Sequence, residues 1–334
     1  TNDTLTWDQS AHGMQVLSII GINYADSMVG SAPDASFVLA RTEDVRTEKH
    51  IEEYNWLRAM EWADSIGVDI IHSSLGYSLF DSLEGNYTYQ DMDGKSTLIT
   101  LAAQQAASRG IFITNSAGNA GNDPWYYITA PCDGKDVLCV GAVDSFEVIT
   151  PFSSRGPSAD GRIKPDICAM GANITVPREN GILRTGSGTS FSGPIIAGMV
   201  ACLMQAHPTR SNSEIFSAIL QSADRYQNAD TLYGNGIPDV LVADSLLTET
   251  SLVVNELNLS LEVEVYPNPS KGIIKIRTEP GSTYMFYGPT GSLLAIGELH
   301  NWINFLDLTS YTVGSYYLKI QSNNRTALRP IQIR

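Results

Sequence analysis

Apolar and polar positions along residues 11–245 alternate between a helical and a strand-like period. Apolar residues recur every three to four positions in two segments, each with a glycine just beyond it, at 51–66 and 96–108. Shorter apolar runs predict strands at 68–71, 111–114 and 137–140. A capping box, Ser211-x-x-Glu214, predicts a further helix to about Ala223. The alternation predicts an α/β fold with a mostly parallel, doubly wound sheet, whose strand ends form one ligand-binding edge.

The pattern changes near residue 250. From Leu261 onward, short strand-like runs are separated by turn residues and no helical period remains; the runs are EVEVY, IIKIRT, TYMFYG, SLLAIGEL, YYLKI and IQIR. A segment of this length and rhythm predicts a small all-β sandwich. We therefore expect three parts, which are an α/β domain over 1–247, a linker over 248–260 and a β-sandwich over 261–334.

Composition and charge narrow the functional classes. The chain has 334 residues, of which 43% are hydrophobic, and its 21 basic and 36 acidic residues give a net charge of −15. This apolar content is that of a globular protein, and so acidic a surface repels phosphate backbones. The longest unbroken apolar stretch, Pro194 to Met204, is too short to span a bilayer. Nucleic-acid-binding modules and membrane proteins are therefore disfavoured.

The four cysteines do not form a zinc-binding pattern. No Cys-x-x-Cys and no cysteine–histidine cluster with metal spacing is present, so no metal site is expected from them. Cys132 and Cys139 flank a short turn-like segment and are able to pair in an oxidising compartment, although their spacing alone does not fix the geometry. Cys168 and Cys202 lie in apolar contexts, which favours two small buried side chains.

A glycine-rich turn, GSGTSFSGP, brings Ser190 to the beginning of an apolar helix. Backbone N–H groups are unpaired there and the helix dipole is positive, so an oxyanion forming beside this serine is stabilised. Pro194 is expected in the first turn, where its missing N–H leaves nothing unpaired. An ordinary helix cap explains the same residues, and the hydrolase elbow Gly-x-Ser-x-Gly is absent because Ser192 replaces its last glycine.

Serine needs a base before it can act as a nucleophile. His12, which Gly13 follows at the start of an apolar helix, is the candidate among five histidines; the others fit structural roles at loops, a strand end and a helix end. Asn119 lies in NSAGNAGN directly after the strand predicted at 111–114, where its carboxamide can reach the ligand edge. Taken singly, His12 and Asn119 are better explained by structural roles.

Together, three segments resemble the signatures of the subtilase family of serine peptidases. They are HGMQV, NSAGNAG and GTSFSGP, in the family's order, and DIIHSSLG, FSSRGP and KPDI add further matches. The resemblance implies a subtilisin-type fold in which Ser190 is the nucleophile, His12 the general base and Asn119 an oxyanion donor beside the Ser190 N–H. Met14 stands where the family has threonine, which changes packing near the base but not the chemistry.

The resemblance also implies where a substrate binds. The backbone of Ser74, Leu75 and Gly76 is expected to pair with an extended peptide, close to Ala117 and Gly118. This chemistry requires no cofactor. Subtilases often carry calcium, but the sequence identifies no ligand set, because Asp91-x-Asp93-Gly94 is only a fragment of a calcium loop.

One departure from the family concerns the third member of the triad. The family has an aspartate on an Asp-Ser/Thr-Gly segment a few tens of residues before the histidine, whereas only eleven residues precede His12. Asp3 and Asp8 have neither the glycine nor the preceding strand. We therefore expect the chain to be the larger piece of a precursor, with its cleaved N-terminal segment bound as a separate chain. The alternative is a non-catalytic, subtilase-like binding or surface protein.

The C-terminal segment resembles a second family. VYPNPSKGIIKI, GPTG and GSYYLKI are similar to the C-terminal sorting domain of type IX secretion cargo. This resemblance implies the type IX secretion machinery as a partner and export across the outer membrane of a Gram-negative bacterium, to the cell surface or beyond. The alternative is a generic β-sandwich accessory module. Both resemblances together predict a secreted serine endopeptidase.

Overall fold

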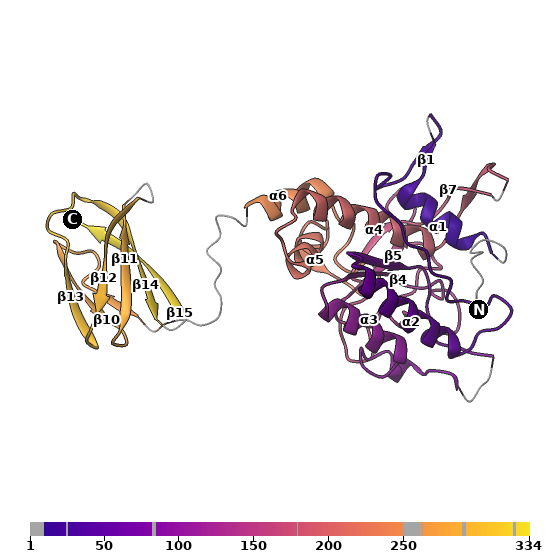
Figure 1. The fold of residues 1–334 in the computed structure, drawn as a ribbon, viewed down its shortest axis with the longest axis horizontal. Coiled ribbons are helices and arrows are strands. Elements are labelled where there is room, and N and C mark those ends of the chain that lie inside the picture. Colours follow the sequence, from indigo (N-terminus) through magenta and orange to yellow (C-terminus); the bar gives the residue numbers. More distant parts are fainter. Residues whose placement is uncertain are drawn as a thin grey trace. The chain divides into compact units, whose positions relative to one another are not determined.

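The computed structural model describes residues 10–24, 26–81, 85–178, 180–249, 261, 263–288, 292–322 and 325–334. It divides the chain into two compact units, Thr1–Ser251 and Leu252–Arg334 (Figure 1). The boundary falls inside the segment expected to be a linker. Of that segment, Thr248 and Glu249 are the last residues of a helix, and 250–260 lie outside the described residues.

The first unit is built on a sheet of four parallel strands in the order β3–β4–β5–β6. These are β3 (Ile70–Ser73), β4 (Phe112–Ser116), β5 (Val137–Val143) and β6 (Ile167–Met170). All four strands run the same way, so their C-terminal ends lie along one edge. β4 and β5 are completely buried, which explains why β5 is an apolar run without alternation. β4 begins with Phe112 and Ile113 but ends in three buried polar residues, Thr114–Ser116. The doubly wound α/β fold expected from the sequence is confirmed.

Helices cover both faces of this sheet (Figure 1). On one face lie α2 (Ile51–Ile66) and α3 (Leu98–Ser108), whose Trp56, Met60 and Ile99 pack with Ile113 and Val137 of the strands. On the other face lie α4 (Thr189–Ala206), α5 (Asn212–Gln221) and α6 (Val240–Glu249), which bury a second cluster that includes Leu138, Val200 and Ile219. Each face therefore has its own apolar core.

Local signals fix most of the helix ends. α2 ends at Gly67, which adopts the left-handed conformation (φ 76°) that glycine tolerates, and α5 begins with the expected capping box at Ser211. α3 begins two residues later than expected, because the Thr97 side chain accepts a hydrogen bond from the Thr100 N–H and so caps the helix. The strand predicted at 68–71 lies at 70–73, because Val68 and Asp69 complete the turn after Gly67.

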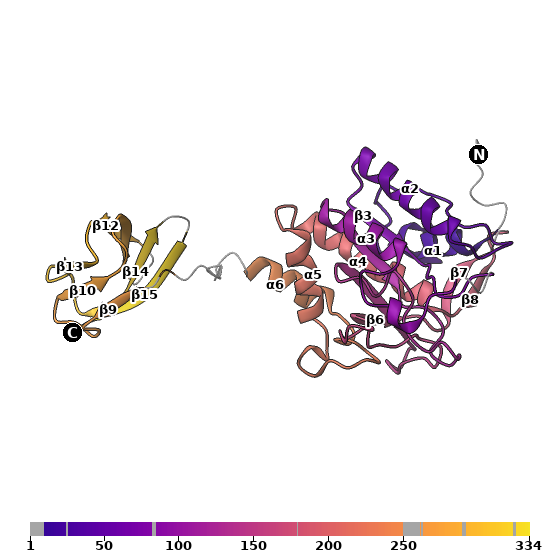
Figure 2. The same cartoon turned by 90° about the horizontal axis from the view of Figure 1, so that it is seen from below.

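The remaining elements of this unit lie around α1 (His12–Gly21). α1 packs against α4 and against a hairpin of β7 (Ile174–Pro177) and β8 (Leu183–Gly186), as Figure 2 shows. Ile19, Val176 and Phe191 form the buried contact. A two-stranded hairpin, β1 (Asn23–Tyr24) and β2 (Met28–Val29), follows α1, and short 3₁₀ turns lie at η2 (Tyr89–Asp91) and η3 (Tyr226–Asn228). This packing places Ile19, near the C-terminal end of α1, against Phe191 in the first turn of α4.

Within the described ranges, α4 is the one helix whose length and composition would allow it to cross a membrane. More than half of it is buried inside the unit, against the sheet on one side and α5 and α6 on the other. Its apolar sequence is therefore accounted for by its position as a central core helix.

The second unit is an antiparallel β-sandwich, as expected. One sheet has the order β13–β10–β9 and the other β12–β11–β14–β15. The strands are β9 (Glu264–Tyr266), β10 (Ile273–Arg277), β11 (Ser282–Tyr287), β12 (Leu293–Leu299), β13 (Ile303–Asp307), β14 (Gly314–Ser322) and β15 (Arg325–Ile333). Phe286, Leu318 and Ile276 are fully buried between the sheets. β13 was not predicted.

The four cysteines fall into three environments. Cys132 and Cys139 form a disulfide with Cα atoms 5.0 Å apart; both are fully buried, and Cys139 lies in β5. Cys168 is buried, as expected. The expectation of a buried Cys202 is wrong, because this residue lies on the side of α4 that faces a large cavity.

Replacing both disulfide cysteines by serine is expected to lower the free energy of unfolding of the first unit by about 2.5 kcal/mol. The bridge closes a loop of seven peptide units, and its loss restores conformational entropy to the unfolded chain. Urea unfolding followed by circular dichroism measures the change, with Cys202→Ser as the control. An unchanged midpoint in the double variant would show that the bridge does not stabilise this unit.

Candidate active site

Ser190 is the second residue of α4, behind the N-cap residue Gly188. The side chain is partly exposed, and its Oγ makes no hydrogen bond within the described part of the chain. Two loops border it, one at the C-terminal end of β3 and one at that of β4. The serine therefore lies at the ligand edge of the sheet, at the positive end of a helix.

Asn119 follows β4 and is fixed to the first turn of α4. The Thr189 N–H donates to its Oδ1 at 2.8 Å, and the Thr189 hydroxyl donates to the same oxygen at 3.0 Å. Because both partners are donors, the carboxamide oxygen must face Thr189, which leaves Nδ2 as a free donor. A Cβ added at Gly188 would lie 3.6 Å from this Nδ2 and 3.8 Å from the Ser190 N, so the two donors border the same space, as an oxyanion site requires.

His12 is the first residue of α1, is half-buried and lines the same cavity as Ser74 and His72. Among the described residues, its imidazole accepts or donates no hydrogen bond and forms no ion pair with a carboxylate. Hydrogen bonds between catalytic groups often tighten only when substrate binds. Burial lowers the pKa of His12 below 6.5, so the neutral form that a general base needs is favoured.

NMR titration of His12 is expected to give a pKa below 6.5 in this chain. Desolvation disfavours the charged imidazolium, and no carboxylate of the described residues stabilises it. The exposed His300 serves as the internal control, and His12→Gln assigns the signal. A value above 6.5 in the isolated chain would mean that a carboxylate lies close to this ring.

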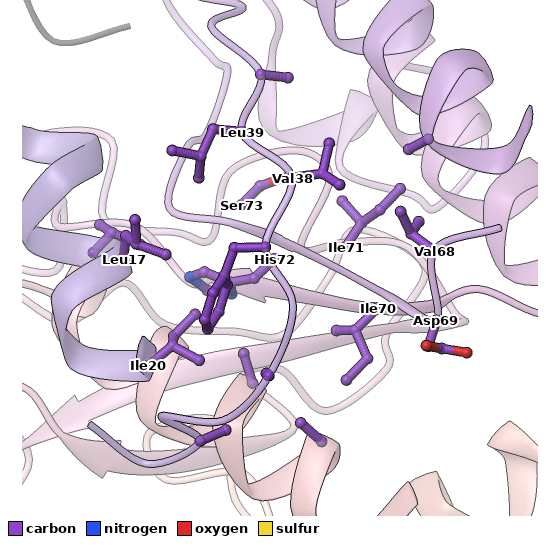
Figure 3. Close-up of a pocket in the computed structure, with 18 of the residues that line it drawn as sticks. Leu17, Ile20, Val38, Leu39, Val68, Asp69, Ile70, Ile71, His72 and Ser73 are labelled. Atoms are coloured by element: carbon purple, nitrogen blue, oxygen red, sulfur yellow. The ribbon is translucent and has the colours of Figure 1, made fainter. Parts of the chain in front are cut away.

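A cavity of about 1350 Å³ lies between α1, residues 36–45 and β3. Figure 3 shows Leu17 and Ile20 of α1, Val38 and Leu39 of the loop, and the residues of β3 around the same space. Among the residues that the structure describes, only β4 pairs with β3, which makes β3 an edge strand. The cavity is therefore bounded by an unpaired strand edge along one side and by His12 near one end.

The residues expected to bind substrate lie in the loops after β3 and β4, but their backbone groups differ in availability. Ser74 and Gly76 make no backbone hydrogen bond within the described ranges. The Leu75 carbonyl, by contrast, accepts from Asn115 Nδ2. The N–H and C=O groups of Ala117 and Gly118 are paired inside the protein. Free backbone groups at every second residue, Ser74 and Gly76, have the spacing of an unpaired strand edge.

Sequence reasoning missed side chains that hold these loops to α4. Thr189 contacts Asn119 and Gly118, and the Ser116 hydroxyl donates to the Thr189 carbonyl at 2.8 Å. His72 was interpreted as a residue at a strand end; it lies within β3, is half-buried and lines the cavity. A histidine inside an apolar strand is the one sequence signal that pointed to this cluster.

The Asp91–Gly94 segment gives no calcium ligand set. Asp91 accepts hydrogen bonds from Thr88, and Asp93 from Lys95 and Ser96, so the carboxylates of the Asp91–Gly94 segment are occupied by neighbouring groups. This segment does not fit a calcium loop. Glu43, Glu48 and Glu52 place carboxylate oxygens within 4.8 Å of one another, and burial and the neighbouring carboxylates raise the pKa of Glu48 to about 7.

Two parts of the chain match known families. Residues 1–236 match the profile of the subtilase family, and residues 264–334 match that of the secretion system C-terminal sorting domain. A sorting domain of this kind implies export from the cell.

Individual proteins are similar over the first part. The chain is 28% identical over 239 residues to subtilisin E of Bacillus subtilis (strain 168), which covers 71% of this chain and 56% of that protein. It is 28% identical over 265 residues to serine protease AprX of the same strain, with 70% and 57% covered. The self-cleaved protease domain of PatA has a similar structure, with a TM-score of 0.59, 26% identity, and 72% and 84% covered. The chain spans little more than half the length of the two Bacillus proteases.

Proposed function

The chain belongs to the subtilase family, and from this premise we propose that it is a secreted serine endopeptidase that hydrolyses peptide bonds through an acyl-enzyme. The observation that carries the proposal is the arrangement at the first turn of α4. Ser190 lies there with an unbonded hydroxyl, Asn119 is anchored beside it with a free Nδ2, and α1 brings His12 to the adjoining cavity.

In the proposed reaction, His12 accepts the proton of the Ser190 hydroxyl while Oγ attacks the carbonyl carbon of the peptide. The carbonyl electron pair moves to the oxygen, and Asn119 Nδ2 and the Ser190 N–H bind the resulting oxyanion. The C–N bond then breaks, and the imidazolium gives its proton to the leaving amine. A water molecule, deprotonated by His12, hydrolyses the ester and restores Ser190.

Substrate is proposed to bind as an extended strand along the loop after β3. The unpaired backbone groups of Ser74 and Gly76 provide hydrogen bonds that do not depend on the substrate's side chains. The backbone groups of Ala117 and Gly118 and the Leu75 carbonyl are already paired, so they contribute shape to this region rather than hydrogen bonds.

The third triad member is proposed to come from a segment that precedes Thr1 in a precursor. The unpaired edge of β3 and the cavity beside it have room for one further parallel strand. Such a strand would end at the same edge as β3, where His12 lies, so an aspartate at its C-terminal end reaches the imidazole. The cleaved segment would then stay bound as a separate chain.

Hydrolysis of an unfolded protein in H₂¹⁸O tests the proposed activity. The product of the complete gene is expected to cut internal peptide bonds and to place one ¹⁸O in each new C-terminal carboxylate, as mass spectrometry detects. Unchanged substrate would favour the alternative of a non-catalytic binding or surface protein, which the absence of a Ser190–His12 hydrogen bond within the described residues also fits.

The second unit is proposed to direct export through the type IX secretion machinery, across the outer membrane of a Gram-negative bacterium. The match over residues 264–334 and the antiparallel sandwich support this assignment. Export to an oxidising compartment also agrees with the buried Cys132–Cys139 disulfide.

A further inference from the structure

Pro194 leaves the carbonyl of Ser190 without its helical partner. In an α-helix, this carbonyl accepts from the N–H four residues later, and that residue is Pro194, which has no N–H. The prediction that Pro194 lies in the first turn is wrong, because it is the sixth residue of α4. The missing N–H of Pro194 therefore removes a hydrogen bond that the helix would otherwise contain. The Ser74 hydroxyl donates to the Ser190 carbonyl at 3.0 Å instead. The backbone of the nucleophile is therefore held by the loop after β3.

The hydrogen bond from Ser74 is the last of a directed series. The Ser74 oxygen has two further neighbours, the Ser116 hydroxyl at 3.4 Å and Nε2 of His72 at 2.9 Å. Since the Ser74 proton is donated to Ser190, Nε2 must be the donor in the hydrogen bond to Ser74. Nε2 then carries the imidazole proton, and Nδ1 accepts from the Thr114 hydroxyl at 2.8 Å. With this tautomer of His72, the Ser74 oxygen accepts from Nε2, and its own proton is directed to the Ser190 carbonyl.

The environment of His72 keeps this arrangement unchanged. Burial and the neighbouring His12 lower the pKa of His72 to about 3, so the ring stays neutral where peptidases work. The ring is also pressed against α4. A Cβ added at Gly193 would lie 2.6 Å from Cε1 of His72 and 2.7 Å from the Ser116 oxygen, so only glycine allows this approach. His72 therefore contacts α4 directly and has little freedom to turn.

We propose that His72 is a positioning residue, which fixes the backbone of Ser190 through Ser74 and so aligns the nucleophile for attack. The proposal rests on the proposed peptidase function. His72 touches no reacting atom; it acts by the single donated hydrogen bond from Nε2 to Ser74.

A matched pair of substitutions tests this role. Gln and Met have similar size and flexibility, but only Gln can donate a hydrogen bond from the position of Nε2. In the product of the complete gene, His72→Met is expected to lower kcat for a peptide substrate about 10-fold with KM changed less than twofold, which is the size of one lost hydrogen bond. His72→Gln is expected to recover most of kcat. Equal kcat values for the two variants, or a change in KM alone, would overturn the proposal.

Two further measurements separate the positioning role from a loss of folding or of the proposed function. The double variant His72→Met with Ser74→Ala is expected to have the same kcat as Ser74→Ala alone. The reason is that both changes interrupt the same series of hydrogen bonds to the Ser190 carbonyl. Labelling Ser with ¹³C′ and Phe with ¹⁵N isolates three Ser–Phe peptide groups, of which Ser190–Phe191 is one. Its ¹³C′ shift is expected to move in His72→Met and not in His72→Gln. This NMR result stands whether or not the protein cleaves peptides, and an unmoved shift in His72→Met would refute the positioning role.

Discussion

Ser190→Ala is expected to lower kcat for peptide hydrolysis by about 10⁶-fold in the product of the complete gene, with KM little changed. Alanine removes the hydroxyl oxygen that we propose forms the acyl-enzyme, while the groups proposed to bind substrate remain. Subtilisins show a loss of this size when their nucleophile is removed, and it is that known magnitude that we adopt. Steady-state hydrolysis of a chromogenic peptide over a wide range of enzyme concentration measures it.

The matched control is Ser187→Ala. Ser187 is an exposed serine three residues earlier, whose Oγ accepts a hydrogen bond from the Asn173 N–H. This variant is expected to keep the activity of the parent within about twofold. If both variants, Ser190→Ala and Ser187→Ala, kept the kcat of the parent protein, the nucleophile would have to be another residue.

The second large effect concerns the carboxylate expected from the N-terminal segment. Changing the proposed aspartate of that segment to asparagine is expected to lower kcat about 10⁴-fold, again the magnitude known for subtilisins. The reason is that His12 has no carboxylate partner among the described residues, so nothing else orients its ring or stabilises the imidazolium. Hydrolysis of the same chromogenic peptide gives the comparison.

Whether the proposed N-terminal segment occupies the cavity can be measured separately, from the reactivity of the Cys202 thiol. This thiol is exposed and lines the cavity, whereas Cys168 is buried and the other two cysteines are bonded to each other. A maleimide is expected to react with Cys202 in the chain alone and to react much more slowly when the segment is bound. Cys202→Ser is the control. Equal labelling in both forms would mean that the segment binds elsewhere.

Much of the fold was predictable because its signals are local. The helix over 51–66 has both its period and its terminal Gly67 in the sequence, and Ser211 with Glu214 specifies a helix start within four residues. Ser190 and Asn119 could be singled out for the same reason, since each follows a glycine-rich turn beside a predicted helix or strand. β13 was missed because its outward residues Ile303 and Phe305 are exposed and apolar, which hides the alternation.

The positioning series was not predictable, because it depends on contacts between distant residues. Ser74 and Ser190 are 116 positions apart, and His72 reaches Thr114 across 42 positions. The exposure of Cys202 was also not predictable from neighbouring residues in the sequence. Its neighbours in sequence are apolar, which predicts burial, but the side of α4 on which it lies faces the cavity beside β3. Tertiary structure, and not local composition, decides its exposure.

Labelling with a fluorophosphonate tests most directly whether His12 and Ser190 act together as base and nucleophile. In the product of the complete gene, mass spectrometry is expected to find the phosphonyl group on the peptide that contains Ser190, with labelling slowed strongly in His12→Gln and absent in Ser190→Ala. A folded protein that carries its N-terminal segment and still leaves Ser190 unmodified would contradict the account.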